Sequence, residues 1–363
     1  MKACSLHRRK LFTALLIAGC SFLAVPSWGN AQQRPPAQAP PLPKPFVTIQ
    51  DSKQFNAVRF GPGNSFSIVE TPPDFRLSEF AISPNGTFLV MGWASGRIEL
   101  WDLPKKKRIS EFKSDFGAPG ILQFDTTGTQ LIVTGSGGKI AFLDLPKGKK
   151  LRSWTIPLGK YKYDIHEIVV DPKGKWLAYA DEENSKVIDL NSDLPNQIAD
   201  LKDASSIALS QDGSELWTVN KAEVVGFSTA TWTVIGHWPL KSSPVSTSLG
   251  LVRTGVTSDG TGIVAVPSEK GLVFYRPAEM AGDYVTGKPT TAVAFAPGRN
   301  IFVNFSGDLT ILTGEGKRLC EKSYKDRVGY AVDEGGQWLA ISDFSKVNLW
   351  RLEDLLRECK EGP

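Results

Sequence analysis

Hydrophobic and polar positions follow one short pattern that recurs between residues 80 and 340. A β-rich apolar run leads into a turn that ends in glycine, and a second apolar run follows. The turn glycines recur every 38 to 47 residues, at Gly86, Gly128, Gly174, Gly213, Gly260, Gly298 and Gly336. Strand signals at a period of about 40 residues indicate repeated small sheets.

Each repeat reads as a hairpin followed by two further strands. Proline early in the turn and glycine at its end suit a tight reversal, as in Ser83-Pro84-Asn85-Gly86. Third strands with strict alternation are predicted at Arg97–Asp102, Lys139–Asp144, Lys186–Asp189, Leu272–Tyr275, Leu309–Leu312 and Lys346–Trp350. Fourth strands follow, as at Arg108–Phe112 and Leu151–Ile156. We therefore predict an all-β fold, a seven-bladed β-propeller of four-stranded antiparallel blades.

Residues 78–115 resemble a WD40 repeat, with Ser83-Pro84-Asn85-Gly86, then Gly96, then Trp101-Asp102 at the end of the third strand. The resemblance covers the chain beyond about residue 65 but is degenerate. The positions equivalent to Trp101-Asp102 in other repeats lack that dipeptide, and the Gly-His that opens a regular repeat is missing. The chain therefore resembles a degenerate, exported WD40-like propeller of bacterial type, and the resemblance implies a scaffold for binding.

Closure of the ring is predicted from the last repeat, which lacks an outer strand. Ser65–Glu70 precedes the first inner strand and is expected to pair with the seventh blade, which would protect a sheet edge. The alternative is that Leu355–Lys360 forms the outer strand, with residues 46–70 packed as an irregular cap.

The first 31 residues are typical of a secretory signal peptide. Lys2 and Arg8-Arg9-Lys10 precede an apolar stretch, Leu11–Val25, which is too short to span a bilayer, and small residues end at Ala31. A rival reading takes Ile17-Ala18-Gly19-Cys20 as a lipoprotein box, with Cys20 lipidated and the protein anchored to a membrane. We predict a signal peptide at 1–31, a proline-rich linker at 32–45 and the propeller at 46–363. The protein would then be periplasmic or secreted.

Export changes the charge balance. The formal net charge of +4 equals the four basic residues of the first 31, which contain no acidic residue, so the mature chain is neutral. No surplus of positive charge remains for nucleic acid. Locally, basic residues gather in the turns before two neighbouring fourth strands, at Lys105, Lys106, Lys107 and Arg108 and at Lys147, Lys149, Lys150 and Arg152. This basic patch could bind an acidic protein or anionic lipid headgroups, or could simply be solvated turns.

Cysteine content agrees with export. Cleavage after Ala31 leaves only Cys320 and Cys359, which could pair in an oxidising compartment and fasten the C-terminal tail to the sixth blade. Two free thiols are the other possibility.

Catalytic and metal-binding signals are scarce. His166 and His237 are the histidines beyond the signal, and neither has the spacing of a metal site. Gly260-Thr261-Gly262 matches part of a dinucleotide fingerprint but lies between predicted strands, where a propeller turn is expected. We predict no cofactor, no metal and no enzymatic activity.

Binding residues are expected on loops of one propeller face. The connection Leu158–Asp164 carries Lys160, Tyr161, Lys162 and Tyr163, and Trp93 is expected to extend the same surface. The predicted function is that of an exported, monomeric, non-enzymatic scaffold for a protein partner, with a cell-envelope assembly as its expected setting. The alternatives are a propeller enzyme of lactonase or quinoprotein type and a glycan-binding module.

Overall fold

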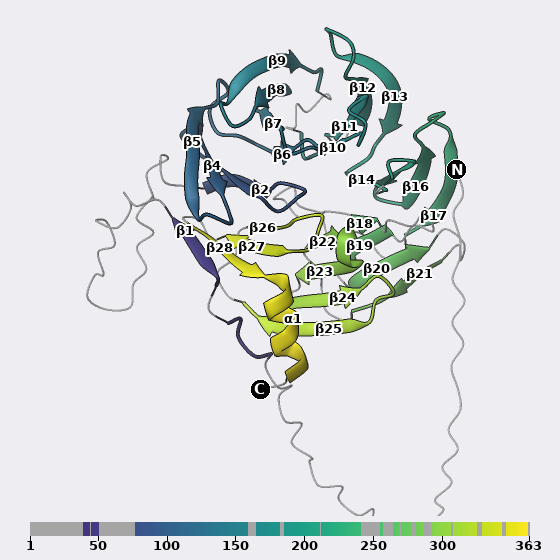
Figure 1. Cartoon of the computed structure of the whole chain (residues 1–363). Helices are drawn as coiled ribbons and strands as arrows, with labels where there is room; N and C mark the ends of the chain where they lie inside the picture. Colours follow the sequence, from purple (N-terminus) through teal and green to yellow (C-terminus); the bar gives the residue numbers. More distant parts are fainter. Residues whose placement is uncertain are drawn as a thin grey trace, which may run out of the picture. The chain divides into compact units, whose positions relative to one another are not determined.

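The structure is a computed structural model (Figure 1), and the account below concerns the unit Ala39–Pro363. The described residues are 39–43, 45–50, 77–158, 165–181, 185–210, 212–240, 255–256, 264–268, 270–276, 281–286, 290, 292–305, 308–324, 329–342 and 346–361. The predicted signal peptide, Cys20 and most of the linker lie outside them.

Strands of the described chain are hydrogen-bonded into seven four-stranded antiparallel sheets. The innermost strands are β2 (Leu77–Ile82), β6 (Leu122–Phe124), β10 (Glu167–Val170), β14 (Ser206–Leu209), β18 (Gly255–Val256), β22 (Ala292–Ala296) and β26 (Gly329–Val332). The second strands are β3 (Phe88–Trp93), β7 (Gln130–Gly135), β11 (Trp176–Ala180), β15 (Glu215–Val219), β19 (Val264–Ser268), β23 (Ile301–Phe305) and β27 (Trp338–Ser342).

The third and fourth positions complete each sheet. The third strands are β4 (Arg97–Asp102), β8 (Lys139–Asp144), β12 (Ser185–Asp189), β16 (Glu223–Ser228), β20 (Gly271–Arg276), β24 (Asp308–Thr313) and β28 (Lys346–Arg351). The outer strands are β5 (Lys107–Lys113), β9 (Lys149–Thr155), β13 (Asn196–Lys202), β17 (Val234–Pro239), β21 (Ala281–Tyr284), β25 (Arg318–Ser323) and β1 (Val47–Gln50). We number the blades from β2–β5 (blade 1) to β26–β28 with β1 (blade 7).

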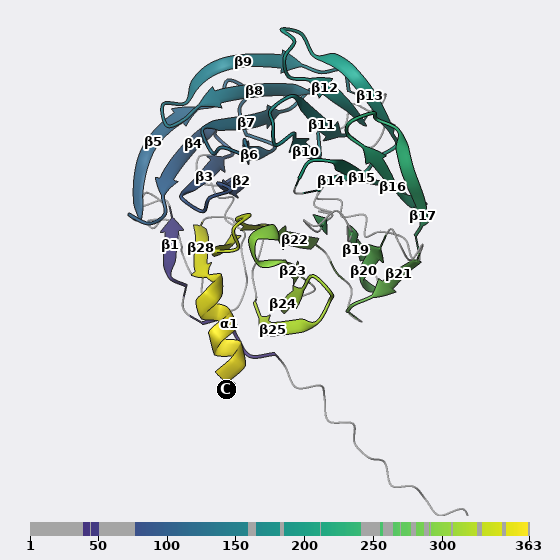
Figure 2. The same cartoon turned by 45° about the vertical axis from the view of Figure 1, so that its right-hand side comes forward.

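The prediction of an all-β propeller of four-stranded antiparallel blades is confirmed. Figure 2 shows β6, β10 and β14 toward the centre and β5, β9, β13 and β17 at the periphery. The predicted bounds of the six alternating third strands agree with the observed bounds to within one residue at each end. The glycine and proline residues of the adjoining turns mark these strand ends in the sequence itself.

The second strands form the core. They are almost wholly buried, whereas the outer strands β5, β9, β13 and β17 are mostly exposed. In β11, Trp176 packs toward blade 4 while its neighbour Leu177 packs toward blade 2. Because successive side chains of a strand point to opposite faces, burial of both faces requires a continuous apolar run. This explains why the sequence shows apolar runs at these positions and alternation farther out.

Hydrophobic clusters lie between consecutive blades. Seven clusters of described residues each draw their buried side chains from two neighbouring sheets, and one of them joins blade 7 to blade 1. The cluster between blades 7 and 1 includes Phe80, Trp93, Trp338 and Leu349. Each sheet is therefore stabilised by its two neighbours, as in other repeat proteins.

The repeated glycine turn has one recurrent hydrogen-bonding pattern. The side-chain oxygen of the first turn residue accepts a backbone N–H four or five residues later, at 2.6 to 3.0 Å, in the turns that start at Ser83, Asp125, Asp171, Ser210 and Asp333. The backbone N–H of the turn glycine donates to the carbonyl of that same first residue. These glycines all have positive φ, near +70°. The sequence pattern thus encodes a turn whose polar groups are internally satisfied.

The turn of blade 6 differs from the prediction. Gly298 lacks the positive φ expected of a turn glycine, and Asn300 takes the left-handed conformation instead, after the 3-10 turn η3 (Pro297–Arg299). Ala296 offers no side-chain oxygen at the first position, so the backbone reverses by a different route. Gly260, the corresponding residue of blade 5, lies outside the described residues.

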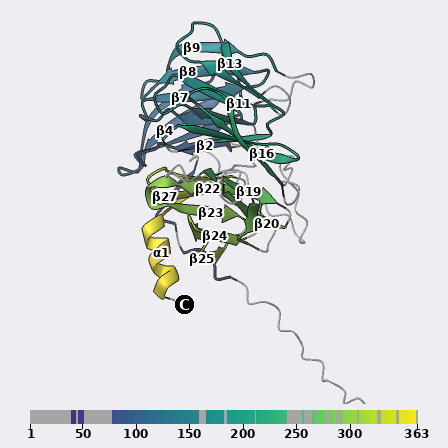
Figure 3. The ribbon, with the colours of Figure 1, turned by 90° about the vertical axis from the view of Figure 1, so that its right-hand side faces the viewer.

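The outer strand of blade 7 was assigned to the wrong segment. β1 pairs antiparallel with β28, with Val47 opposite Leu349, so Ser65–Glu70 does not hold that position. Ser65–Glu70 itself lies outside the described residues. The alternative is also wrong, because Leu355–Lys360 belongs to a helix, α1 (Leu352–Glu361), which packs on β25 (Figure 3). Proximity in sequence to the first inner strand was a poor guide to which segment pairs.

No helix of the described residues combines the length and apolar character needed to cross a membrane.

Alanine substitutions at two turn glycines distinguish the cost of backbone strain from the cost of a steric clash. Gly174 and Gly213 occupy the same turn position in blades 3 and 4, with φ of +67° and +74°. A Cβ on Gly174 would meet no atom within 4 Å, whereas one on Gly213 would lie 2.8 Å from Pro172 Cδ. We expect Gly174→Ala to cost about 1–2 kcal/mol of unfolding free energy from the left-handed backbone and Gly213→Ala to cost more. Urea denaturation followed by tryptophan fluorescence measures both, and equal losses would contradict the clash.

Asp333 should make stability depend on pH. It is almost fully buried, and loss of hydration is the main cause that raises its pKa above 3.8, against hydrogen bonds from Trp338 and Gln337. The folded state therefore holds the proton more tightly than the unfolded state, and stability falls as pH rises above about 4. The substitution Asp333→Ser introduces the residue found at the same turn position in blades 1 and 4, Ser83 and Ser210. The urea midpoint of this variant should exceed that of the parent at pH 7.5, by a margin that shrinks as the pH is lowered.

A matched control for this experiment is Asp212→Asn. Hydrogen bonds led by the Ser214 backbone N–H lower the pKa of Asp212, so its carboxyl is ionised in both states above pH 5. The change in urea midpoint caused by Asp212→Asn should be the same at pH 7.5 and at pH 5. A constant margin for Asp333→Ser would contradict the assignment to Asp333.

Candidate functional site

The basic patch lies on two hairpins that contact each other. Lys105–Arg108 belongs to the β4–β5 hairpin of blade 1, and Lys147–Arg152 to the β8–β9 hairpin of blade 2. Lys150 Nζ is 2.5 Å from Asp115 Oδ2 across the two blades. Gly148 lies so close to the Phe112 ring that a Cβ there would be 2.4 Å from it. The β8–β9 turn therefore packs against the C-terminal end of β5, and Lys105–Arg108 lies at the other end of that strand.

Part of the patch is neutralised by carboxylates. Lys105 Nζ lies 2.9 Å from Asp102, whose pKa is lowered mainly by the hydrogen bond from that ammonium group. Arg108 pairs with Glu99 at 3.2 Å and with Glu111 at 2.6 Å. The lysine and arginine ends of these pairs are exposed, whereas the carboxylates of Glu99 and Asp102 are buried.

Three lysines of the patch remain available. Lys107, Lys147 and Lys149 are exposed and form no ion pair with the described residues. Their charges are not compensated within the described residues, so each of these lysines can form a new ion pair with a bound partner.

Two predicted members of the patch contribute to the fold instead. The Arg152 guanidinium lies 4.3 Å from the Phe142 ring centroid, and it donates a hydrogen bond to the Leu190 carbonyl. Partial burial lowers the pKa of Arg152, against the nearby charge of Asp189. Lys106 Nζ lies 3.9 Å from the ring centroid of Phe46, just before β1. Both cations are held on aromatic faces.

The predicted aromatic and lysine surface is corrected at one residue. Trp93 is fully buried between blades 7 and 1, so it cannot line an exposed face. It ends β3, whose burial on both sides overrides its position next to a turn. Lys160, Tyr161, Lys162 and Tyr163 lie outside the described residues.

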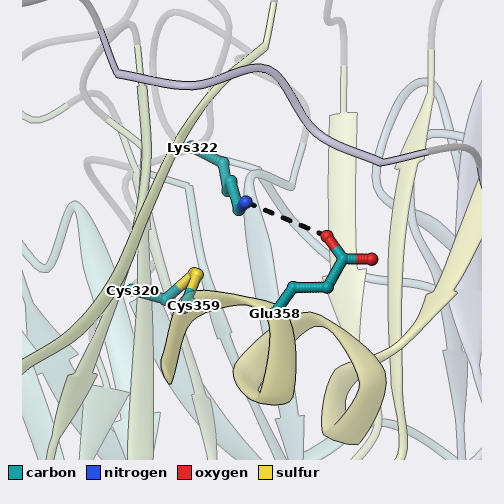
Figure 4. The surroundings of a disulfide bond; sticks show 4 residues. All are labelled: Cys320, Lys322, Glu358 and Cys359. Carbon is teal, nitrogen blue, oxygen red and sulfur yellow. Dashed lines mark ion pairs between the residues drawn. A yellow bond between two sulfur atoms is a disulfide. The ribbon is translucent and has the colours of Figure 1, made fainter. Parts of the chain in front are cut away.

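Cys320 and Cys359 form a disulfide that ties α1 to β25 (Figure 4). Their Cα atoms are 5.4 Å apart, within the normal range for such a bond. Beside it, Lys322 Nζ of β25 lies 3.9 Å from Glu358 Oε2 of α1. Leu355 and Leu356 of the helix pack in the cluster between blades 6 and 7.

A central cavity of about 560 Å³ is lined by the inner strands β2, β6, β10 and β26. Glu79, His166, Glu167 and Glu334 contribute polar groups, and the described lining residues include neither lysine nor arginine. Glu167 Oε2 accepts hydrogen bonds from Ser206 Oγ and the Ile207 backbone N–H, at 2.6 and 2.8 Å, so this carboxylate joins blades 3 and 4. Among the described residues, no group of three His, Cys, Asp or Glu side chains could hold a metal ion.

The sequence reasoning missed the carboxylates of the cavity. Glu79 directly precedes the predicted inner strand that begins at Phe80, and Glu167 is a polar position beside the apolar residues of another inner strand, so alternation was the available signal. Which polar residues face the centre depends on strand register, which the tertiary structure decides.

No protein-family model matches the chain, and no curated protein matches it. Among solved structures, the β-propeller domain of Cps50 (Swd1) from Myceliophteria thermophila is similar. The TM-score is 0.61 and the identity 16%, and the match covers 76% of this chain and 96% of that chain. Similarity at this identity concerns the fold alone, and it supports a β-propeller.

Loss of the disulfide should release α1. The bond closes a loop with a sequence separation of 39 residues, which corresponds to about 3–4 kcal/mol of chain entropy. We expect Cys359→Ser to lower the urea midpoint, and dithiothreitol to bring the parent to the same value. Lys360→Ser, at the next position of the helix, is the control and should leave the midpoint unchanged. A parent whose midpoint does not respond to reduction would contradict this role.

Proposed function

We propose that this protein is an exported, non-enzymatic scaffold that binds an acidic protein partner through the basic patch. The observation that carries the proposal is the set of exposed lysines on the outer hairpins of blades 1 and 2, where Lys107, Lys147 and Lys149 lack ion-pair partners among the described residues. The patch lies on hydrogen-bonded hairpins, and a rigid display of charge favours specific association. The propeller fold is consistent with a scaffold.

Export is proposed from the signal-like residues 1–31 together with the disulfide. Cys320 and Cys359 are the cysteines that remain after removal of those residues, and they are bonded to each other. Disulfides persist mainly in oxidising compartments. A periplasmic or secreted, monomeric protein of the cell envelope fits this pairing, and lipidation at Cys20 is the alternative that would add a membrane anchor.

We also infer that the blades close into a single ring of seven. Support comes from the hydrophobic cluster between blades 7 and 1 and from the pairing of β1 with β28. In this arrangement the beginning of the propeller supplies the outer strand of its last blade, and the edge of β28 is protected.

The central cavity is the observation that favours the enzymatic alternative. Glu79, Glu167 and His166 line it, and carboxylates beside an imidazole can serve acid–base chemistry. A lactonase or quinoprotein activity would place the functional site there. The basic patch carries the preferred proposal because its lysines are both exposed and uncompensated.

Charge reversal tests the scaffold. Lys107→Glu with Lys149→Glu should lower the yield of a cross-linked protein partner at least about fivefold in the native envelope, because attraction becomes repulsion. The matched control is Lys221→Glu with Lys270→Glu, which reverses two exposed lysines between second and third strands, at the opposite ends of their strands. Mass spectrometry identifies and quantifies the captured species. Equal yields of the cross-linked partner from the two double variants would show that the basic patch is not part of the binding surface.

A further inference from the structure

Two segments from distant parts of the chain cover the last residues of β25. One is α1, and the other is residues 39–43, here called the strap. The strap runs parallel to β25 at a single bridge, with Pro41 opposite Ser323. The Ser323 N–H donates to the Pro40 carbonyl at 2.7 Å, and the Leu42 N–H donates to the Ser323 carbonyl at 3.2 Å. The strap therefore occupies the hydrogen-bonding edge of β25 at this point.

The strap and the helix share one apolar cluster. Leu42 is half-buried and packs in the cluster between blades 6 and 7, together with Leu355 and Cys359 of α1. Beside it, the Trp350 indole N–H donates to the Pro43 carbonyl at 2.9 Å. Burial of apolar area is the main favourable term for such short segments. The burial of each segment therefore depends in part on the presence of the other.

The strand that follows the strap is held independently of α1. β1 pairs with β28 along its whole length, and the Phe46 N–H donates to the Leu349 carbonyl at 2.7 Å. The ring centroids of Phe46 and Trp338 are 5.3 Å apart. These contacts are made with blade 7 and involve neither α1 nor β25. A change at α1 is therefore expected to reach the strap and to stop at Phe46.

The disulfide ties α1 to β25 and is open to attack from one side (Figure 4). Cys320 is 3% exposed, whereas Cys359 is only half-buried. Thiol–disulfide exchange requires that an incoming thiolate reach one of the two sulfur atoms. Cys359 Sγ is therefore the atom that is attacked, and Cys320 is the leaving thiolate.

α1 is too short to persist once it is released. It has 10 residues, and isolated helices below about 12–15 residues are marginal in water. Leu352 and Leu355 are its fully buried side chains. Its glutamates pair with Lys322 and Arg299 at 3.9 and 3.8 Å, and both carboxylates are on exposed residues. Ion pairs of this kind contribute little, so the disulfide decides whether α1 stays on blade 6.

We propose that the Cys320–Cys359 disulfide is a redox switch that holds α1 and the strap on β25 together. A thiolate of a dithiol donor attacks Cys359 Sγ, the S–S bond breaks with Cys320 leaving as the thiolate, and the second thiol of the donor then releases Cys359. Two electrons and two protons pass to the cysteines, and the donor becomes a disulfide. The helix and the strap leave together, and the edge of β25 at Ser323 opens to pairing with another strand. The inference does not rest on the basic patch.

Amide hydrogen exchange of the full chain measures release of the strap. The reporters are the backbone N–H groups of Leu42 and Ser323, which form the two hydrogen bonds between the strap and β25. Reduction with dithiothreitol should speed exchange at both at least about tenfold, because a protected amide exchanges only when its segment opens. The Phe46 N–H is the internal control and should keep its rate. Mass spectrometry with fragmentation to single residues resolves these positions.

Cysteine variants separate the switch from other effects of the reductant. Cys320→Ser with Cys359→Ser should show the fast exchange at Leu42 without dithiothreitol, and the reductant should not change it further. Lys360→Ser, at an exposed position next to Cys359, is the matched control and should behave like the parent in both conditions.

Coupling between the two segments must also act in the opposite direction, because linkage is reciprocal. Leu42→Ser removes the apolar contact of the strap, so α1 opens more often and dithiothreitol should reduce the disulfide at least about fivefold faster. Pro41→Ser is the matched control, because Pro41 is the exposed neighbour of Leu42, and it should change the rate less than about twofold. Thiol alkylation followed by mass spectrometry measures the rate of reduction.

Three results would overturn the inference. Unchanged exchange at Leu42 and Ser323 on reduction would show that the strap does not depend on the disulfide. Exchange at Phe46 that rises as much as that at Leu42 would show general unfolding instead of local release. Equal rates of reduction for Leu42→Ser and Pro41→Ser would show that the strap and α1 are not coupled.

Discussion

Burial of apolar side chains between neighbouring sheets is the constraint on which this structure depends. Each second strand lies inside its sheet and packs against two other blades, so no blade shields its own faces. A fully buried large apolar side chain contributes about 1.5–3 kcal/mol, and the clusters link blade to blade through the whole described chain. Stability is therefore shared by neighbours and does not reside in any one repeat.

The same constraint explains where binding chemistry can occur. Inner and second strands are committed to packing, so variation is tolerated at turns, at outer strands and around the central cavity. Outer strands are hydrogen-bonded on one side alone, and they accommodate bulges and lysines that would be costly inside a sheet. The basic patch on the outer hairpins of blades 1 and 2 follows from this freedom.

The C-terminal region shows how an exposed edge can be covered. Beyond β28 the chain forms α1, which returns to blade 6 and is held there by a disulfide. Residues ahead of β1 also reach this edge, because the Leu42 backbone N–H donates to the Ser323 carbonyl. Two segments from opposite ends of the propeller thus meet on β25. The outer strands β5 and β9 are contacted instead by the hairpin of the next blade, through Gly148 on Phe112 and through hydrogen bonds from Arg152 and Trp154 to the Leu190 and Asp193 carbonyls.

The sequence by itself determined the repeat, the strand positions and the glycine turns, because these depend on local backbone preferences and on periodicity. It also supplied the cysteine pair and the basic hairpins. The tertiary structure decided that β1 and not Ser65–Glu70 pairs with β28, that the C-terminal residues form a helix, and that Trp93 is buried. The bulges of the outer strands β5 and β9, at Ile109 and Leu151, also emerged only there. These features depend on which distant segments meet, and local sequence carries little information about that.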